Sequence, residues 1–534
     1  MPSALLPEQH AADRAEWHLV PRFMLRVGGL PFETADRLTS PRGAAWADDV
    51  LDGEARLRAD GARLSDLLEA RVAGHMDDPK ARRLLINLRR DVFNGRAPRG
   101  LDRAAELLPA PDVARLREWA DARARHEELL RAGAAILGEE TTACRAELRR
   151  LTESTDLRLG VQLSSPTLDE HLDAYLGKGE GRLSKRERRI ERSLLEYLYR
   201  TACKTSPFST LTSVCLGTFT GTHGDGAGAA LHVSAHHWDK RSATRLNVAV
   251  LSRLSALMAD TPSVRGDLPV RATGGLEVHR DRVRYLRRLR ETGNEDTAVT
   301  LDTVHENLFY LPTGDLLTDV LAQFDDGGTL RFEDLVARLC ALREGRPADE
   351  VGEYLAALLR LGLLVVPGLR LDIHDPDPVA GYRRGLAALH AGWADRVSGI
   401  VGELGSLVAE FAGAGPDRRR DLLAALADGV RDAHRALGRD DLPVLRTLVY
   451  EDTTLPGARV TADRERWNRD LLPDLRRLAP LMPAFDGNEV RRLVTKGFFT
   501  IRYGSGGRCE DVLTFAHEFL QDFYDNYNQR LMRH

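Results

Sequence analysis

The chain has 534 residues, of which 43% are hydrophobic, and its formal net charge is −4, from 76 Lys and Arg against 80 Asp and Glu. A chain of this length is expected to fold as two to four packing units. The near balance of charge excludes a uniformly basic nucleic-acid-binding protein, so any contact with nucleic acid has to come from cations gathered in one place.

Cysteine usage and hydropathy exclude further classes. The five cysteines are odd in number and contain no C-x-x-C pair, which argues against a zinc ribbon and against a disulfide framework. The amino terminus has no apolar core of a signal peptide, and the most apolar stretch, Tyr354 to Leu371, is interrupted by Arg360 and Pro367. We therefore predict a cytoplasmic protein that does not enter a membrane.

The amino-terminal part of the chain shows helical periodicity. From Leu57 to Leu151 apolar residues recur at helical spacing among charged ones. A further helix is predicted from Ser184, which forms an S-x-x-E capping box with Glu187. Its first half carries the densest run of cations in the chain. Arginine at a helix start opposes the helix dipole, so this run is a candidate for contacts with a nucleic-acid backbone, with a solvated helix face as the alternative.

The most informative segment runs from Tyr199 to Gly217. Arg200 and Lys204 lie one helical turn apart and share a face. Pro207 lacks an N–H and disfavours helix at Ser206, so the helix is predicted to end there and to pass into a strand rich in Thr and Val. A cationic helix end beside a sharp turn is suited to hold a phosphate or a reacting oxyanion.

The middle of the chain is predicted to mix strands and helices. Strands are expected from Phe208 to about Arg290, with a hairpin turning at Arg280 and Asp281. Residues Asp302 to Leu364 are predicted to be helical, and their end resembles the last helix and wing strand of a winged-helix unit. The closely spaced prolines of His374 to Pro378 indicate a linker.

After this linker we expect two helices, separated at Ala412 to Pro416, and then a mixed tail. The tail is predicted to contain strands at Val444–Tyr450 and Phe498–Tyr503 and a last helix from Asp511 to Met532. The predicted fold is therefore α+β and multi-subdomain, with a helical amino-terminal part, a mixed sheet core, a winged-helix-like unit and a mixed α/β tail. The expected domains are a helical region over 1–160, an α+β core with the turn motif and the winged-helix-like unit over 161–372, and a helical hairpin with the tail over 373–534.

The wording of the turn, R-x-x-x-K-T-S-P-F-S from Arg200 to Ser209, resembles the R-x-x-x-[RK]-x-[TS]-P-F signature of the lantibiotic dehydratase amino-terminal region, the LanB-type glutamylation domain. Shorter pieces follow in that family's order: Phe23 to Pro31, Leu88 to Arg96, Leu163 to Pro166, Arg245 to Asn247, Tyr450 to Asp452 and Arg502 to Gly504. The ordered set spreads over most of the chain and is more specific than any of its parts.

The resemblance implies a specific chemistry, in which a Ser or Thr hydroxyl of a precursor peptide attacks the ester carbonyl of an aminoacyl-tRNA, usually glutamyl-tRNA. One ester replaces another, so the exchange needs neither a cofactor nor a metal, but it needs positioned substrates and donors for the oxyanion. By motif position the resemblance implies catalytic roles for Arg200, Lys204, Ser206 and Asp452, and binding of substrate or tRNA by Arg26 and Asn247. We add, as predicted tRNA contacts in the cationic helix, Arg186, Arg188 and Arg189.

Two positions differ from the commonest residues of the family motif. Lys204 stands where Arg is frequent, and an ammonium cannot reproduce a planar bidentate fork. Asn247 stands where some members have Asp, so no carboxylate is available there. Asp452, next to Glu451, is then the candidate general base or hydroxyl-orienting carboxylate, with an ordinary turn carboxylate at a strand end as the alternative.

The favoured function is thus tRNA-dependent glutamylation of Ser or Thr in a ribosomally made precursor peptide of lantibiotic or thiopeptide biosynthesis. A full dehydratase of the family also carries an elimination domain, for which this chain is too short, so we expect a split or truncated member. The alternatives are a peptide aminoacyl-tRNA ligase that uses ATP and a non-catalytic protein that binds a leader peptide or a partner. Expected partners are the precursor peptide with its leader, tRNA and, for a split member, a separate elimination-domain protein; a homodimer is left open.

Overall fold

The computed structural model describes residues 18–178, 181–206, 208–221, 231–235, 239–279, 281–291, 303–343, 345–371 and 375–520. Contacts divide the chain into two units. The sheet unit comprises Met1–Gly29, Arg158–Asp169 and Thr205–His534, and the hairpin unit comprises Leu30–Leu157 and Glu170–Lys204. The three domains expected from the sequence remain a prediction. In the described part of the chain no helix is both long and apolar enough to cross a membrane.

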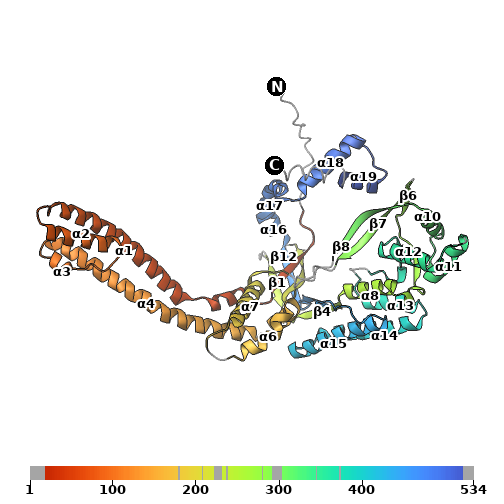
Figure 1. Cartoon of the computed structure of the whole chain (residues 1–534), viewed down its shortest axis with the longest axis horizontal. Helices are drawn as coiled ribbons and strands as arrows, with labels where there is room; N and C mark the ends of the chain where they lie inside the picture. Colours follow the sequence, from red (N-terminus) through yellow and green to blue (C-terminus); the bar gives the residue numbers. More distant parts are fainter. Residues whose placement is uncertain are drawn as a thin grey trace, which may run out of the picture. The chain divides into compact units, whose positions relative to one another are not determined.

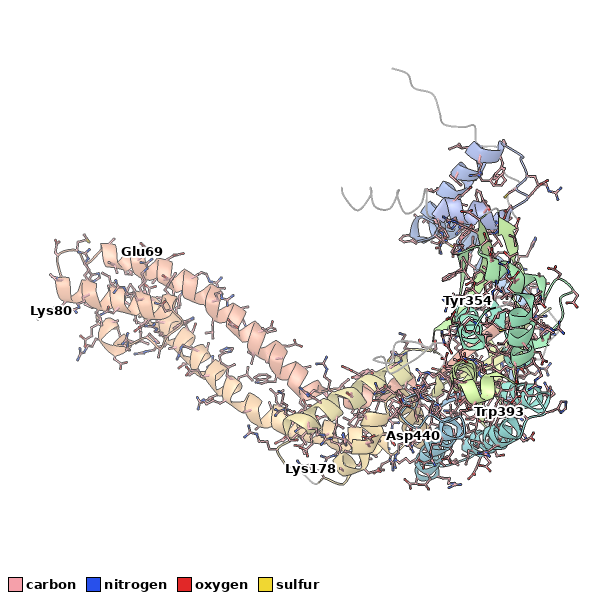
Figure 2. The ribbon with its side chains drawn as sticks, turned by 45° about the vertical axis from the view of Figure 1, so that its right-hand side comes forward. Glu69, Lys80, Lys178, Tyr354, Trp393 and Asp440 are labelled. Carbon is pink, nitrogen blue, oxygen red and sulfur yellow. The ribbon has the colours of Figure 1, made fainter. Side chains whose placement is uncertain are left out.

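The hairpin unit is built on two long helices that lie side by side and carry two shorter ones at one end, where Figure 2 shows Glu69 and Lys80. Leu68, Leu85, Leu88 and Leu116 are fully buried where these helices meet. The helices pack closely because Gly133 admits the Trp46 ring, which lies where a Cβ atom would be. The elements are η1 (Phe32–Leu38), α1 (Pro41–Ala73), α2 (Pro79–Phe93), α3 (Leu101–Ala104) and α4 (Ala110–Thr152). The helical periodicity expected here is confirmed.

The cationic helix is α7 (Lys185–Cys203), which follows α5 (Thr155–Ser164) and α6 (Pro166–Leu176). The predicted capping box is present: the Glu187 N–H donates to the Ser184 hydroxyl, and the Ser184 N–H donates to the Glu187 carboxylate. The helix ends at Cys203, with Lys204 as an extended C-cap, three residues earlier than predicted.

The sheet unit contains a six-stranded mixed sheet centred on β2. Along one edge, β2 pairs antiparallel with β1. Along its other edge, it pairs parallel first with β11 and then with β12. Strand β4 pairs antiparallel with β11, and β3 pairs antiparallel with β12. Gly217 is required at its position because the Phe23 ring covers the site of a Cβ atom. The strands are β1 (Arg22–Gly28), β2 (Ser209–Thr220), β3 (His232–Ala235), β4 (Arg241–Leu246), β11 (Val449–Thr454) and β12 (Ala458–Asp463).

A helical layer packs against this sheet and forms the largest described core. Buried side chains of α8 and of the α14–α15 pair meet there, including Leu251, Leu254, Leu404 and Leu422. The Thr244 hydroxyl of β4 donates to the Val408 carbonyl of α14 at 2.7 Å, which fixes the sheet edge to the helices. Figure 1 shows α14 and α15 side by side. The helices are α8 (Val248–Asp260), α9 (Pro262–Arg265), α13 (Pro378–Ala387), α14 (Gly392–Phe411) and α15 (Pro416–Ala436), with the predicted break before Pro416. The prediction of strands from Phe208 to about Arg290 is wrong for α8 and α9. Three helices follow the predicted linker instead of two, because α13 begins at Pro378 and is capped by Asp377.

Residues 269–369 form the winged-helix-like part, in which three helices pack on a small sheet of order β10-β5-β9. The predicted hairpin is confirmed as antiparallel β6–β7, although Arg280 at its turn lies outside the described residues. The prediction of helix from Asp302 is wrong for Thr303–Pro312, which form β8 because they pair along β7. The elements are β5 (Pro269–Ala272), β6 (Glu277–His279), β7 (Arg282–Glu291), β8 (Thr303–Pro312), α10 (Asp315–Ala322), β9 (Leu330–Arg331), α11 (Phe332–Leu342), α12 (Ala348–Arg360), β10 (Leu364–Val365) and η2 (Pro367–Leu369).

The tail after the sheet is helical. The predicted strand at Phe498–Tyr503 is wrong, because Phe499 and Tyr503, one helical turn apart, pack with Phe515 instead of pairing in a sheet. The predicted last helix begins one residue after Asp511, and its end lies outside the described residues. The elements are α16 (Arg464–Asp470), α17 (Leu472–Leu478), η3 (Ala479–Phe485), α18 (Glu489–Tyr503) and α19 (Val512–Glu518). The predicted α+β fold class is confirmed, with these local corrections.

Candidate functional site

One face of the six-stranded sheet is open and carries charged side chains. Alternate residues of a strand point to opposite faces, and in β1 the exposed set includes Arg22 and Arg26. The same alternation exposes Asp452 on β11 and two arginines on β4, Arg241 and Arg245. On the other face Phe23, Leu25, Cys215, Leu455 and Val460 form an apolar cluster. We call the exposed side the open face.

The strand register aligns part of this set across the sheet. Arg26 pairs with Val214, Val214 pairs with Thr454, and Thr454 pairs with Arg241. Neighbouring strands lie about 4.8 Å apart, so the Cα atoms of Arg26 and Arg241 are separated by roughly 14 Å. This row spans four strands, and Arg26, one of the predicted site residues, is at one end of it.

Asp452 lies two residues before Thr454 on the same face. It pairs with Ala243, and the two residues diagonal to it on β4 are Arg241 and Arg245. Diagonal neighbours in an antiparallel pair are about 7–8 Å apart, within reach of long side chains. The Arg245 guanidinium also lies 5.8 Å from the centre of the Tyr450 ring. The predicted carboxylate is therefore exposed and flanked by cations of one neighbouring strand.

Glu451, the neighbour of Asp452, points to the opposite side and is fully buried. Its carboxylate forms a bidentate ion pair with Arg419 of α15, with Nη1–Oε2 at 2.9 Å and Nη2–Oε1 at 2.6 Å. The hydroxyls of Ser209 and Ser242 donate to the same carboxylate. Because four donors satisfy the buried charge, Glu451 is a structural anchor that ties β2, β4, β11 and α15 together.

The Arg419 guanidinium is equally well enclosed. Its Nε donates to the carbonyls of Phe411 and Ala414, at 3.1 and 3.2 Å, and its carbon centre lies 4.3 Å from the centre of the Phe411 ring. The Arg419 side chain is only 1% exposed, so its charge is removed from water. The hydrogen bonds, the Phe411 ring and the Glu451 carboxylate together offset the free-energy cost of this desolvation.

The turn motif enters the sheet at Ser209, the first residue of β2. Ser209 has φ of +48°, a left-handed conformation that is uncommon for residues other than glycine. Its hydroxyl is held by Glu451, and its backbone is in register with Asp452. Ser206, a predicted catalytic residue, is half-buried three residues before this point. The anchor thus fixes where the motif meets the strand that carries Asp452.

Asn247 is buried at the start of α8 and makes local contacts. Its side-chain oxygen accepts from the Ala249 N–H at 2.9 Å, and its amide donates to the Thr447 carbonyl at 2.8 Å. These bonds cap α8 and join it to the segment before β11. Its predicted role in binding stays a prediction.

Arg200 and Lys204 belong to the hairpin unit, at the carboxyl end of α7. Both side chains are exposed, and the Lys204 N–H donates to the Arg200 carbonyl at 2.9 Å. Glu196, one turn before Arg200, forms its ion pair with Arg192 at 2.9 Å. The structure therefore places Arg200 and Lys204 together at the carboxyl end of α7, and Arg26 and Asp452 together on the open face.

The amino-terminal half of α7 exposes Arg186, Arg188 and Arg189. Arg186 contacts the His171 ring, and Arg188 donates to the Leu183 carbonyl at 3.4 Å. A hydrogen bond from Lys178, with the bonds from Ser184, lowers the pKa of Glu187 to about 2. Glu187 therefore stays ionised at the positive end of the helix dipole, where it offsets the neighbouring cations.

Among the described residues no group of three or more His, Cys, Asp or Glu side chains is placed to hold a metal ion, and the expectation of no metal stays a prediction. The expectation of no cofactor stays a prediction.

Comparison with known proteins gives the class of the chain. The model of the family described as "Lantibiotic dehydratase, N terminus" matches residues 153–463, a range that contains every predicted site residue except Arg26. The chain belongs to this family. No curated protein sequence matches it.

The fold is similar to that of a solved structure, the glutamylation domain of TbtB from thiomuracin biosynthesis, with a TM-score of 0.59 at 20% sequence identity over 91% of this chain and 55% of the other. The same domain bound to 5'-phosphodesmethylglutamycin gives a TM-score of 0.58, also at 20% identity and with the same coverage of both chains. The tRNA-dependent lantibiotic dehydratase MibB from Microbispora sp. 107891 matches at 0.47, at 19% identity over 67% of this chain and 32% of the other. The chain thus spans about half the length of the TbtB domain.

Three parts of the site were missed from the sequence. Arg419 stands in an Arg-Arg-Arg run that gives no sign that only its middle member is buried. The sequence prediction takes Glu451 and Asp452 together as carboxylates, although adjacent residues of a strand point to opposite faces. The arginines of β4 could also have been found from the sequence. Arg241 and Arg245 are four residues apart, and residues an even number apart in a strand point to the same face.

Proposed function

We propose that the chain transfers the glutamyl group of glutamyl-tRNA to Ser or Thr hydroxyls of a ribosomally made precursor peptide. The observation that carries this proposal is the family match over residues 153–463, which includes the turn motif and the strand with Asp452. The similarity in fold to a glutamylation domain of thiomuracin biosynthesis supports the same half-reaction.

In the proposed reaction the peptide oxygen forms a bond to the acyl carbon, and the bond from that carbon to the ribose oxygen of the tRNA breaks. The proton of the attacking hydroxyl passes to Asp452 and then to the departing ribose oxygen. The tetrahedral intermediate carries a negative oxygen that needs cationic donors, and Arg200 and Lys204 are proposed for this role from their motif positions alone. Asp452 is suited to its part because it is exposed on a rigid strand whose other face is fixed by the Glu451–Arg419 pair.

Substrate binding is proposed to use the remaining cations. The three arginines near the start of α7 are exposed and are proposed to contact the tRNA backbone. On the open face, Arg26 is proposed to contact the acyl group or the end of the tRNA. A separate protein that performs the elimination step is proposed as the partner that completes dehydration.

The experiment incubates the purified chain with a precursor peptide and glutamyl-tRNA and measures the intact peptide mass. We expect a gain of one glutamyl ester that depends on charged tRNA and does not require ATP. The Asp452→Asn variant should lose this activity, whereas Asp349→Asn, an exposed carboxylate on α12, should retain it. An ATP-dependent gain of an amino acid at a peptide terminus would support the ligase instead, and leader binding without any mass change would support a non-catalytic protein.

A further inference from the structure

The open face carries positive charge that its own carboxylates do not balance. Besides the four arginines of β1 and β4, its described residues include Arg459 of β12, against two aspartates, the exposed Asp452 and the half-buried Asp463. Asp463 is already engaged, because it caps α16 by accepting from the Arg466 N–H at 3.0 Å. Within the described part of the chain, neither Arg22 nor Arg459 forms an ion pair.

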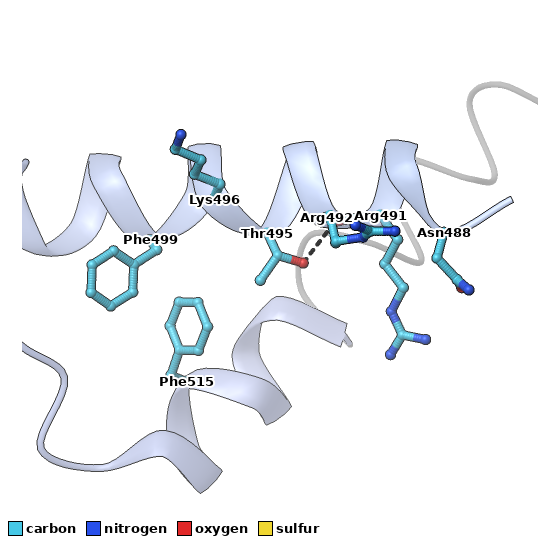
Figure 3. A pocket seen from close by; sticks show the side chains of 7 residues that line it. All are labelled: Asn488, Arg491, Arg492, Thr495, Lys496, Phe499 and Phe515. Atoms are coloured by element: carbon cyan, nitrogen blue, oxygen red, sulfur yellow. Dashed lines mark hydrogen bonds between the residues drawn. The ribbon is translucent and has the colours of Figure 1, made fainter. Parts of the chain in front are cut away.

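The tail of the sheet unit differs in this respect. A cavity of about 420 Å³ lies there between α18 and α19 and is lined by arginines and phenylalanines (Figure 3). Its Arg492 forms ion pairs with Asp486 and Glu489, so the positive charge at that end is compensated within the chain. The arginines of the open face are therefore better placed to meet an anionic group of another molecule.

An exposed apolar pair lies among the arginines of the open face. Met24 of β1 and Leu216 of β2 are paired in register and are 58% and 67% exposed. Side chains directly opposite each other in an antiparallel pair have Cβ atoms about 4.5–5.5 Å apart, so these two form one apolar patch. A ligand that covers both side chains removes apolar surface from water, which favours binding.

The strand register places cations beside this patch. Arg22 lies two residues before Met24 on the same face of β1 and is paired with Thr218. On the other side, the parallel register of β12 with β2 brings Arg459 next to Leu216. A carboxylate held above Thr218 is therefore within reach of both long arginine side chains. The matching ligand has an apolar side chain and, beside it, an acidic one.

The same register gives the distance from the patch to Asp452. Leu216 and Asp452 lie on opposite sides of the row in which Val214 pairs with Thr454, each two residues from it. With about 3.3 Å per residue and about 4.8 Å between strands, their Cα atoms are roughly 14 Å apart. An extended peptide rises about 3.3–3.6 Å per residue, so this distance corresponds to about four residues. Residues an even number apart share one face of an extended chain, so a side chain at this spacing points to the patch.

A peptide matches this surface better than a nucleic acid does. Single-stranded nucleic acids are usually bound by cations together with aromatic side chains on which the bases stack. The described neighbours of the patch on the open face are aliphatic, cationic or hydroxyl-bearing, and none is aromatic; they include Arg26, Val214 and Thr218. The Tyr450 ring of this face lies beside Arg245 instead. The patch thus offers aliphatic groups beside cations, which suits an apolar amino acid near a carboxylate.

We propose that the patch of Met24 and Leu216, with Arg22 and Arg459, binds the segment of the precursor peptide next to the hydroxyl that is acylated. It selects an apolar side chain four residues from that hydroxyl and a carboxylate two residues further on. Only the position of the hydroxyl rests on the proposed glutamyl transfer, since the patch and its two arginines bind the same side chains without the reaction.

The first measurement is binding of fluorescein-labelled peptides to the full chain, by fluorescence anisotropy. The parent probe is a glycine-rich peptide with one Ser, one Leu four residues from it and one Glu two residues beyond the Leu. Both orders of these residues are made, because the register does not fix the direction of the peptide. Replacing the Leu by Gly should weaken binding about tenfold, since the patch is then uncovered. Moving the Leu by one residue should have the same effect, because it then points away from the sheet.

Variants of the chain test the same contacts from the other side. Leu216→Thr, which keeps a β-branched residue on the strand, should weaken the parent probe about tenfold and leave the probe without Leu unaffected. Arg459→Glu should weaken the parent probe about fivefold and strengthen a probe with Lys in place of Glu, because the charges are then exchanged. The controls Arg338→Gln and Leu342→Thr, at exposed positions of α11, should leave binding unchanged.

Two results would overturn the proposal. One is equal binding of the parent probe and the probe with the displaced Leu. The other is binding of the parent probe that is unaffected in folded Leu216→Thr and Arg459→Glu proteins. The oligoribonucleotide ACCA is measured alongside, and if it binds more tightly than the parent probe and loses affinity in Arg459→Glu, the surface is an RNA site and the peptide assignment is wrong.

Glutamyl transfer to a precursor peptide is scored separately, by peptide mass. Leu216→Thr should lower kcat/KM for a precursor with an apolar residue four positions from the acylated hydroxyl. Transfer that is unchanged in this variant would contradict the role of the patch and leave the proposed function standing. Binding of the probes with the expected pattern but without any transfer would contradict the proposed function and leave the patch as a peptide site.

Discussion

Replacing Arg419 by Met should destabilise the sheet unit far more than the same change at its neighbour Arg418. The Arg419→Met variant removes two charge-assisted hydrogen bonds from a carboxylate with no exposed surface and leaves only Ser209 and Ser242 as donors. Loss of one partner of a buried ion pair typically costs about 3–5 kcal/mol. That is a large part of the 5–15 kcal/mol by which a typical domain is stable.

Arg418 provides the matched control. It forms an ion pair with Glu410 at 2.7 Å, but both side chains are about half exposed. Exposed pairs contribute about 0–1 kcal/mol, so Arg418→Met should have little effect. The two variants change the same residue type at adjacent positions of one helix, and they differ in whether the partner carboxylate is buried.

The assay is hydrogen exchange of the peptides that contain β2 and β11, because a chain of two units need not unfold in one step. A loss of 3–5 kcal/mol corresponds to exchange faster by roughly two to three and a half orders of magnitude. If β2 and β11 exchange equally fast in the Arg419→Met and Arg418→Met proteins, the anchor assigned to Glu451 is wrong.

Three further predictions concern the cations and the tail. Arg200→Ala and Lys204→Ala should each remove most glutamyl transfer, measured by peptide mass, while the circular dichroism of the protein stays unchanged. Lys204→Arg should retain activity. Full activity in a folded Arg200→Ala protein would contradict the assignment. Changing Arg186, Arg188 and Arg189 together to Gln should lower the slope of log affinity for tRNA against log salt by up to about 2.7, whereas the same change at Arg82, Arg83 and Arg90 of α2 should not. The hydrogen bond from Arg284 holds the pKa of Asp511 well below its usual range, so this carboxylate stabilises the tail above about pH 4, and that contribution is lost as the pH falls through the lowered pKa. Asp511→Asn should therefore lower the melting temperature at pH 7 and remove this acid dependence, while Glu510→Gln, at an exposed neighbour, should keep both.

Helices with strong local signals were predicted well from the sequence. The capping box at Ser184 and the break before Pro416 depend on residues close in the chain, and the structure confirms both. The stretch predicted as strands from Phe208 contains helix α8, so that prediction was wrong there. Two other segments were predicted wrongly because their structure depends on residues far away in the chain. Residues 303–312 become a strand through pairing with β7, and Phe498–Tyr503 becomes helical because its rings pack with α19. Such tertiary partners override local propensity and are not visible in a short window.

The candidate site was predictable in part. The turn motif and the Tyr450 to Asp452 piece identified two strands that the structure places side by side, with Ser209 in register with Asp452. The register across four strands, which aligns Arg26 with Arg241, depends on pairings between residues far apart in the chain. Burial of Arg419 likewise depends on a carboxylate 32 residues away and on two serines from other strands.

The pair Glu451–Asp452 shows how one strand can divide stability and chemistry between adjacent residues. The Glu451 carboxylate accepts hydrogen bonds from four donors on the buried side of the strand. These bonds hold the strand backbone in place, and Asp452 extends from that backbone on the open face. A carboxylate that orients a hydroxyl must be held within a fraction of an ångström, and a rigid strand achieves this better than a loop. A folded variant with a loosened anchor, such as Glu451→Gln, should therefore lose transfer activity even though every proposed catalytic side chain is present.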